Sequence, residues 1–364
     1  MSIRRIHTRP EEIEPLRLFS QLDIGAELGL AASERAASFM NRIRRGLDDS
    51  LASPSRLHGW RVQSMFASTV LALGDFTLLK LEDAGECYAA EHEGRVKLPD
   101  FRLVTSEGEQ LLTEVKNVAP RNGMLDRRIR RTEFERLTRY ATLTGARLTF
   151  AHYWSALNTW TLVDANTLAP EGERMRLELQ DAVMADELVT LGDRILATTP
   201  PLVLSLIADT RAPRSRIPAN GGEEVRFTVA AVELSCAGQA ITDHREREIA
   251  MALMMYGSWP QEWAIRANDG RPLTGLDLVA RPIPEEQEQA EKQGFATIGR
   301  LSSLYSTIYN AATLGEDGEV EHLGHTVTPG LMGGLIPENY WSRSEHALPL
   351  WVFEAHPASA AGVL

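Results

Sequence analysis

Short apolar runs follow one another along the first half of the chain, and their residue types predict β-strands. Aromatic and branched apolar residues are concentrated in them, and turn-forming glycine, serine and aspartate residues separate several of them. The runs cover residues 76–81, 100–105, 110–117, 147–154 and 159–163. Because successive side chains of a strand point to opposite faces of a sheet, each run can contribute to a core.

Three longer segments in the same half have apolar residues at helical spacing. They cover residues 10–50, 56–73 and 125–144, and the last of them is strongly charged. Gly74 and Gly145 directly follow the second and third segments. Glycine in that position is typical of a helix C-terminus, so both ends are predicted with a physical reason.

The order of these elements is helix, three strands, helix and two strands. A helix placed between strands favours a mixed, partly parallel sheet with helices packed on its faces. We therefore predict an α/β fold with a mixed central sheet over residues 55–165, preceded by a helical extension over residues 1–54.

Residues 166–364 differ in character and predict a separate α+β domain of unknown role. Strands are expected over residues 225–234 and as a pair within 263–280 that turns at Asn268-Asp269-Gly270, and helices over 245–256, 285–292 and 298–314. Asp243 is expected to cap the first of these helices. No motif in this half indicates a particular chemistry.

The composition is that of an ordinary globular protein. The 364 residues suffice for about two domains, and 43% hydrophobic with 24% charged residues excludes global disorder. No apolar run approaches the roughly 18 residues of a membrane span. No targeting signal is expected either, because no apolar segment follows the basic residues at the N-terminus. Two distant cysteines, Cys87 and Cys236, favour a reduced, cytoplasmic setting.

The distribution of charge is more informative than the net charge of −12, which argues against a protein that coats nucleic acid nonspecifically. Residues 121–139 contain seven arginines and three acids, a local charge of +4 (7 − 3). Arginine binds phosphate with a planar fork of donors. The nucleic-acid-binding candidates are Arg127, Arg128, Arg131, Arg136 and Tyr140. The alternative is a solvated helix face on which arginines pair with glutamates.

Three charged residues on two predicted strands form the main candidate for chemistry. Glu114 and Lys116 are two positions apart on one strand, so their side chains project from the same side. Asp100 begins the preceding strand, and a hairpin between the two strands brings it close to Glu114. Two adjacent carboxylates repel each other unless a cation or a proton lies between them.

A Mg²⁺ ion would relieve that repulsion, because it prefers hard oxygen ligands and keeps several bound waters. A bound metal ion lowers the pKa of its water and neutralises charge that develops on a phosphate. Lys116 could orient that water or stabilise the transition state. The backbone carbonyl of Val115 is a candidate for a further ligand.

The segments Pro99-Asp100 and Glu114-Val115-Lys116 resemble the motif of the PD-(D/E)XK nuclease superfamily. The order of elements over residues 55–165 is similar as well. The resemblance implies a restriction-endonuclease-like core and a phosphodiesterase that depends on Mg²⁺ or Mn²⁺ and acts on DNA. Asp100 and Glu114 would hold the metal, and Lys116 would position the attacking water. The motif is short, and the alternative is a pair of edge strands with exposed charges.

The sequence departs from that family pattern on the helix before the motif. Many members carry an acidic residue there, whereas residues 56–73 contain no aspartate or glutamate and offer Gln63 instead. Four glutamates follow later, in the next strand or its loop: Glu82, Glu86, Glu91 and Glu93. Arg136 and Tyr140 occupy a place where some members have Gln-x-x-x-Tyr. His152, on an apolar strand, is interpreted as a core histidine, with a position facing the site as the alternative.

The function predicted from these observations is a metal-dependent nuclease, with DNA favoured and RNA not excluded. A nuclease with such a second domain would suit restriction, phage defence or mobile-element biology. The second domain could form a homodimer or bind a partner protein. The alternative is a protein with the nuclease fold that binds nucleic acid, or acts as a scaffold, without cutting.

Overall fold

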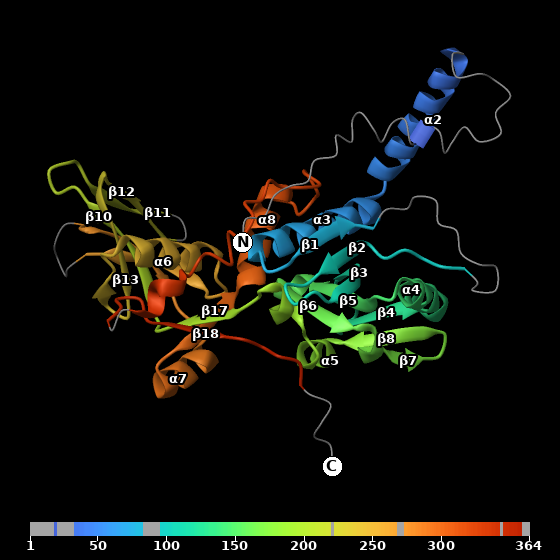
Figure 1. Cartoon of the computed structure of the whole chain (residues 1–364). Helices are drawn as coiled ribbons and strands as arrows, with labels where there is room; N and C mark the ends of the chain where they lie inside the picture. Colours follow the sequence, from blue (N-terminus) through green and yellow to red (C-terminus); the bar gives the residue numbers. More distant parts are fainter. Residues whose placement is uncertain are drawn as a thin grey trace.

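A computed structural model describes residues 18–19, 33–82, 95–219, 222–267, 273–342 and 345–358 (Figure 1). Its helices are α2 (Ser33–Leu51), α3 (Pro54–Leu73), α4 (Arg131–Thr144), α5 (Leu179–Met184), α6 (His244–Tyr256), α7 (Pro284–Gln293) and α8 (Leu301–Thr313). Single 3-10 turns occur at η2 (Ser155–Leu157), η3 (Ala165–Thr167), η4 (Leu188–Leu191) and η5 (Glu338–Ser342).

The strands of the first half are β1 (Leu78–Leu81), β2 (Phe101–Val104), β3 (Gln110–Val118), β4 (Asp126–Arg130), β5 (Arg147–Trp154), β6 (Thr159–Asp164), β7 (Ala169–Glu171) and β8 (Arg174–Glu178). Those of the second half are β9 (Ile195–Thr198), β10 (Leu202–Ala208), β11 (Ser215–Ala219), β12 (Gly222–Arg226), β13 (Val229–Cys236), β14 (Gln239–Ala240), β15 (Gln261–Arg266), β16 (Gly275–Ala280), β17 (Ala296–Arg300) and β18 (Leu350–Phe353).

The sheet that carries the candidate residues is mixed, with the order β1-β2-β3-β5-β6. Strands β1, β2 and β3 form an antiparallel meander, β3 pairs in parallel with β5, and β5 pairs antiparallel with β6. The parallel pair is joined by a segment that contains α4, as a parallel connection requires. The predicted mixed sheet flanked by helices is therefore confirmed.

Each face of this sheet packs into its own hydrophobic cluster. Leu111 and Val115 of β3 belong to one cluster with residues of α3 and α8. Leu112, on the opposite face, belongs to a second cluster with Leu137 of α4 and Ile129 of β4. Figure 1 shows α3 and α8 on one side of the sheet. The two-residue repeat of β3 therefore decides which layer each of its side chains enters.

The second half of the chain is built on another five-stranded sheet, in the order β14-β13-β10-β16-β15, whose pairs are all antiparallel. Helix α6 packs on this sheet through Ile249 and Leu253. Asp243 caps α6 as predicted, because its side chain accepts hydrogen bonds from the backbone N–H groups of Arg245 and Glu246.

The two halves share one hydrophobic core. The cluster on the α3 face of the first sheet continues into residues of α6, β9 and β10. Helix α8, from the second half, packs against α3 and β6, and the indole N–H of Trp160 donates to the Ser306 hydroxyl at 3.0 Å. The helical layer on this face of the first sheet is thus completed by residues far along the chain.

A buried ion-pair network reinforces this junction. Arg300, at the end of β17, contacts Asp186 and Asp193, each at 2.7 Å. Asp186 also accepts the backbone N–H of Leu162 at 2.9 Å, and Asp193 accepts the hydroxyl of Ser302 at 2.8 Å. Breaking a buried ion pair leaves an uncompensated charge in the interior. Arg300 is therefore expected to be important for stability.

The helix predicted over residues 125–144 is wrong in its first part. Asp126–Arg130 form strand β4, which pairs antiparallel with β8, and α4 begins only at Arg131. The β8 partner lies more than forty residues away in the sequence. This pairing overrides local helix propensity, and as a result Arg127 and Arg128 lie on a strand.

Two boundaries in the second half are also different from the prediction. Residues 298–314 contain strand β17 before α8, because Ala296–Arg300 pairs with β9. The predicted strand 225–234 is divided between β12 and β13. The first error concerns a strand whose partner, β9, is distant in sequence, whereas β12 pairs with the adjacent strand β11. The predicted strand pair within 263–280 is confirmed as β15 and β16.

Some predictions fall outside the described residues. They are most of the helix over residues 10–32, the turn at Asn268-Asp269-Gly270, and the positions Glu86, Cys87, Glu91 and Glu93. The later part of the first predicted helix is confirmed as α2. None of the described helices is both long enough and apolar enough to cross a membrane.

We expect Arg300→Met to lower the free energy of unfolding by about 3–5 kcal/mol, because it leaves the buried carboxylates of Asp186 and Asp193 without a cation. Urea unfolding followed by circular dichroism measures the change. Arg281→Met is the matched control: it removes an exposed pair with Glu262 and is expected to cost less than about 1 kcal/mol. Equal losses in the two variants would contradict the role of the buried network.

Candidate active site

Asp100 lies one residue before β2, where the meander of the first sheet ends. The last paired residues of β2 and β3 are Phe101 and Thr113, and continuing that register by one position places Asp100 opposite Glu114. Oδ2 of Asp100 accepts the backbone N–H of Val115 at 2.7 Å. Its Oδ1 accepts the side-chain amide of Gln63, from α3, at 2.7 Å. The carboxyl is therefore held by two groups in a defined orientation.

Glu114 lies in the middle of β3, with only 2% of its surface exposed. Its Oε1 accepts from the ammonium groups of Lys116 and Lys97, each at 2.7 Å. Its Oε2 is buried and has no hydrogen-bond partner in the part of the chain that the structure describes. A buried carboxylate oxygen without a partner is unusual in a folded protein, and it marks a position where a further ligand would be stabilised.

Glu133 extends the cluster from the first turn of α4. Its Oε1 accepts from Lys97 at 2.6 Å and from Lys116 at 3.2 Å, so both lysines bridge the same two glutamates. Burial opposes ionisation of this carboxyl. Hydrogen bonds and charge from the two lysines nevertheless lower the pKa of Glu133 to about 2. The site therefore contains two lysine ammonium groups shared between two glutamates.

Asp100 differs from Glu133 in its electrostatic environment. Burial, and then the negative charge of Glu114, raise the pKa of Asp100 to about 7, and the Val115 N–H and the two lysines only partly compensate. This is the behaviour expected of a carboxyl held close to a second acid. A cation between Asp100 and Glu114 would remove the repulsion that raises this pKa.

The donors at this position suit a hard divalent cation in type but are few in number. Asp100 and Glu114 supply carboxylate oxygens, and Gln63 binds Asp100 rather than adding an acid. Within the described ranges, no group of three or more histidine, cysteine or acidic residues is arranged to hold a metal ion. Mg²⁺ retains several waters in protein sites, so two acids and a carbonyl group can suffice for it.

The sequence motif did not predict two members of the cluster, Lys97 and Glu133. Lys97 lies three positions before Asp100, in a segment without regular secondary structure. Glu133 contributed only to the charge count of the arginine-rich segment. Its place in the first turn of α4, beside two lysines, depends on how α4 packs against the sheet. A local sequence signal for either residue is absent.

The arginine-rich segment does not form one surface. Arg127 is partly buried on β4, whereas Arg128 is exposed on the same strand and pairs with Asp126 and Glu171. Arg131 and Arg136 are exposed on α4. The Tyr140 hydroxyl donates to Glu82, which also binds Arg102, so Tyr140 is engaged within the protein. Of the nucleic-acid-binding candidates, only Arg127 lies near the carboxylates.

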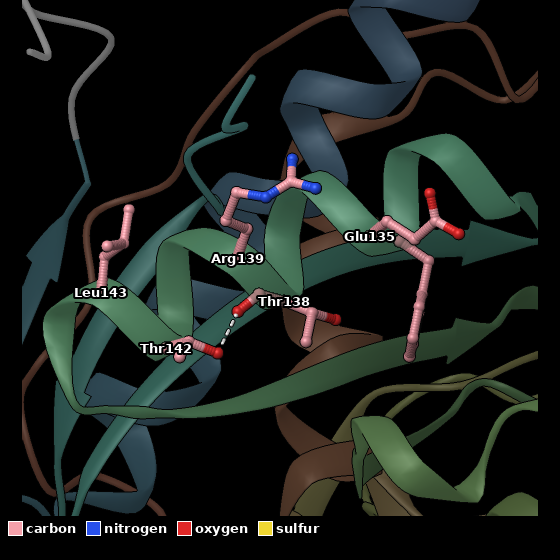
Figure 2. Close-up of a pocket in the computed structure, with 6 residues that line it drawn as sticks. Glu135, Thr138, Arg139, Thr142 and Leu143 are labelled. Carbon is pink, nitrogen blue, oxygen red and sulfur yellow. Dashed lines mark hydrogen bonds between the residues drawn. The ribbon is translucent and has the colours of Figure 1, made fainter. Parts of the chain in front are cut away.

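A separate hollow of about 320 Å³ lies along α4, and all of its lining residues come from that helix. Figure 2 shows Glu135, Thr138, Arg139, Thr142 and Leu143 around it. The acids and lysines described above do not line it. We therefore assign the candidate chemistry to the carboxylate and lysine cluster rather than to this hollow.

Asp100→Asn is expected to stabilise the metal-free protein above neutral pH. The folded-state pKa of about 7 lies above the ordinary value of 3.8, so the unfolded chain releases this proton first. Stability is therefore lost as the pH rises from about 4 towards 7. The amide avoids that loss, and a rotated Gln63 amide can still pair with it. At pH 8 in EDTA we expect a melting temperature higher by about 2 °C or more.

Thermal unfolding of both proteins across the pH range measures this difference. The gap should close as the pH falls below the ordinary pKa of 3.8, where Asp100 becomes protonated in the unfolded state as well. A variant that is less stable than the parent protein at pH 8 would show that the negative charge of Asp100 is favourable in the fold.

Comparisons with known proteins add little. No model of a known protein family matches the chain, and no curated protein matches it. Among solved structures, the chain is similar to Hjc, a Holliday junction resolvase from Archaeoglobus fulgidus, an archaeal hyperthermophile. The two are 17% identical with a TM-score of 0.29, and the match covers 37% of this chain and 96% of the resolvase chain. Likeness at that level carries no argument about fold or function.

Proposed function

We propose that this protein is a metal-dependent nuclease that hydrolyses phosphodiester bonds, with DNA as its substrate. The observation that carries the proposal is the pair Asp100 and Glu114: Glu114 has a buried oxygen that no described residue binds, and Asp100 beside it has a pKa raised to about 7. The resemblance of Pro99-Asp100 and Glu114-Val115-Lys116 to the PD-(D/E)XK motif supports the same function.

Asp100, Glu114 and the carbonyl of Val115 are the proposed ligands of Mg²⁺ or Mn²⁺. The N–H and C=O of one strand residue point towards the same neighbouring strand. Because the Val115 N–H binds Asp100, its carbonyl is expected at the same edge of β3. When bound, the metal ion would supply a water of lowered pKa and neutralise charge on the phosphate.

Lys116 is proposed to orient the attacking water and to stabilise negative charge on the phosphate. Its ammonium group lies 2.7 Å from Oε1 of Glu114, and its side chain is 14% exposed. Lys97 contacts the same oxygen and is 38% exposed, so it lies closer to solvent. Gln63 is proposed to hold Asp100 in orientation.

Further proposals concern the division of the chain into regions and its biological role. Residues 55–165 would form a restriction-endonuclease-like core, with residues 1–54 as an extension and 166–364 as a region for substrate, a second copy or a partner. One hydrophobic core extends across both halves of the chain. This supports a fixed position of residues 166–364 relative to the proposed active site. Restriction, phage defence or mobile-element biology would suit such an enzyme.

We expect the protein to cut plasmid or linear DNA in Mg²⁺ or Mn²⁺ and to be inactive in EDTA. Asp100→Ala and Lys116→Ala should each reduce the cleavage rate about a hundredfold or more, because the first removes a proposed metal ligand and the second removes the group that would orient the water and stabilise charge on the phosphate. Gel electrophoresis of timed reactions measures the rate, and an RNA substrate of the same sequence tests which nucleic acid is preferred.

Glu135→Gln is the matched control for these variants, since Glu135 is an exposed acid two positions from Glu133 on α4. It should leave the cleavage rate unchanged. Nucleic-acid binding without cutting in either metal would support the alternative of a nuclease-like binding protein. Cleavage that persists in EDTA would contradict the metal-dependent mechanism.

A further inference from the structure

Several buried polar atoms that have no hydrogen-bond partner among the described residues lie on one face of the first sheet, next to Glu114. Besides Oε2 of Glu114, they are Nε of Arg127 and both ring nitrogens of His152. These three residues come from three different strands, β3, β4 and β5. Folded proteins pair nearly all buried polar groups, and the exceptions need an explanation. A missing ligand is one such explanation.

Arg127 points towards the sheet because of the alternation of β4. Ile129, two positions along, is buried in the cluster that includes Leu112 and Leu137, so Arg127 shares its inward face. The only hydrogen bond of the Arg127 guanidinium within the described part of the chain is a long one, from Nη1 to the carbonyl of Asn117 at 3.5 Å.

Arg127 also has no ion pair with any described residue, in contrast to its neighbour Arg128, which pairs with Asp126 at 3.3 Å and Glu171 at 2.9 Å. The charges of Glu133 and Glu114 act on it from nearby, but both glutamates are already bound by Lys97 and Lys116. Burial lowers the pKa of Arg127 without removing its charge. A guanidinium with unused donors therefore lies beside the carboxylates.

His152 lies on β5 directly beside Lys116 of β3 in the parallel register, and it is 0% exposed. Its ring packs between Phe150 and Trp154, with centroids 6.1 and 5.9 Å away. Burial, and then the charges of Arg127 and Lys116, lower the pKa of His152 to about 3 despite the opposing effect of the nearby Phe150 backbone, whose contact with the ring does not have hydrogen-bond geometry, so the ring is neutral at physiological pH. A neutral imidazole still has one N–H to donate.

We propose that Arg127 and His152 bind a phosphate group beside Asp100 and Glu114. The inference rests on the proposed nuclease function and assigns the residues that hold the reacting phosphate from the side of β4 and β5. Arg127 supplies the charge and two parallel donors, and His152 supplies one neutral donor. Neither residue belongs to the motif that first indicated the site.

The hydrogen-bond donors that Arg127 and His152 offer are suited to an anion with several acceptor oxygens. A metal cation would be repelled by Arg127 and Lys116, and a water molecule would leave the guanidinium charge uncompensated. A phosphate can accept from Nε and a terminal nitrogen of Arg127 at once, in the fork geometry that guanidinium favours. Arg127 is only partly buried, so part of this residue remains accessible to solvent.

Thermal unfolding in EDTA with increasing inorganic phosphate tests the proposal without a metal ion and without cleavage. Chloride is adjusted to keep the ionic strength constant. Phosphate should raise the melting temperature of the parent protein, as any ligand of the folded state does. In Arg127→Gln the apparent dissociation constant should increase about tenfold to a hundredfold, which corresponds to the loss of charge-assisted hydrogen bonds.

Arg130→Gln is the matched control, because Arg130 is an exposed arginine on the same strand and its side chain faces away from the sheet. It should respond to phosphate as the parent protein does. The proposal is wrong if phosphate does not stabilise the parent protein. It is equally wrong if Arg127→Gln and Arg130→Gln lose the response to the same extent.

Two further variants allow the proposal to be tested even if Arg127→Gln fails to fold. Arg127→Lys retains the charge without the fork and should bind phosphate with intermediate affinity. His152→Phe preserves the aromatic packing between Phe150 and Trp154 and removes only the donor, so it should weaken phosphate binding. An unchanged phosphate response in a folded His152→Phe would remove His152 from the site.

A cleavage assay then separates this inference from the proposed function. If the protein cuts DNA, inorganic phosphate should inhibit the parent protein competitively and Arg127→Gln much less, and KM should rise in that variant. Activity with unchanged KM and unchanged phosphate inhibition in Arg127→Gln would overturn the inference and leave the nuclease proposal intact. Phosphate binding through Arg127 in a protein that cuts no DNA would support this inference and contradict the nuclease proposal.

Discussion

The carboxylate of Glu114, buried in the middle of β3, is the constraint on which the arrangement of this site depends. Two ammonium groups, from Lys97 and Lys116, bind one of its oxygens, and none of the described residues binds the other oxygen. A buried negative charge is tolerated only when cations or hydrogen-bond donors compensate for it. The lysines provide that compensation, and they also connect β3 to Glu133 of α4.

The fold keeps this charge in place by surrounding β3 on both edges and both faces. Strands β2 and β5 pair with its edges, α3 and α8 cover one face, and α4 with β4 covers the other. Helix α8 comes from the second half of the chain, where the buried Arg300 network fixes its start. The second half thus contributes directly to the rigidity of the first sheet.

Charge is divided unevenly across the site, and this division suggests distinct roles. The pKa of Glu133 is lowered because two lysines bind its Oε1, whereas the pKa of Asp100 is raised because this carboxyl is buried and close to Glu114. On the β4 and β5 side, Arg127 contributes a positive charge and His152 a neutral ring. A cation is favoured between the two acids, and an anion is favoured beside the arginine. The proposed metal ion and the proposed phosphate would therefore each lie where the local charge favours them.

The local features of this protein follow from its amino-acid sequence alone. Strand alternation was sufficient to place Glu114 and Lys116 on one side of β3, and the short loop between β2 and β3 was sufficient to bring Asp100 opposite Glu114. Most elements of the first half, and the cap at Asp243, also followed from local propensity and periodicity. These features depend on neighbours within a few residues, which a sequence displays directly.

The features that depend on residues far apart in the sequence can be seen only in the folded protein. The pairing of β4 with β8 turned part of an expected helix into a strand and directed Arg127 inward. Packing of α4 brought Glu133 to the lysines, and the junction through Trp160 and Arg300 joined halves that the sequence separates. Strand partners and packing faces are selected by the burial of the whole core, so no single segment contains the information that fixes them.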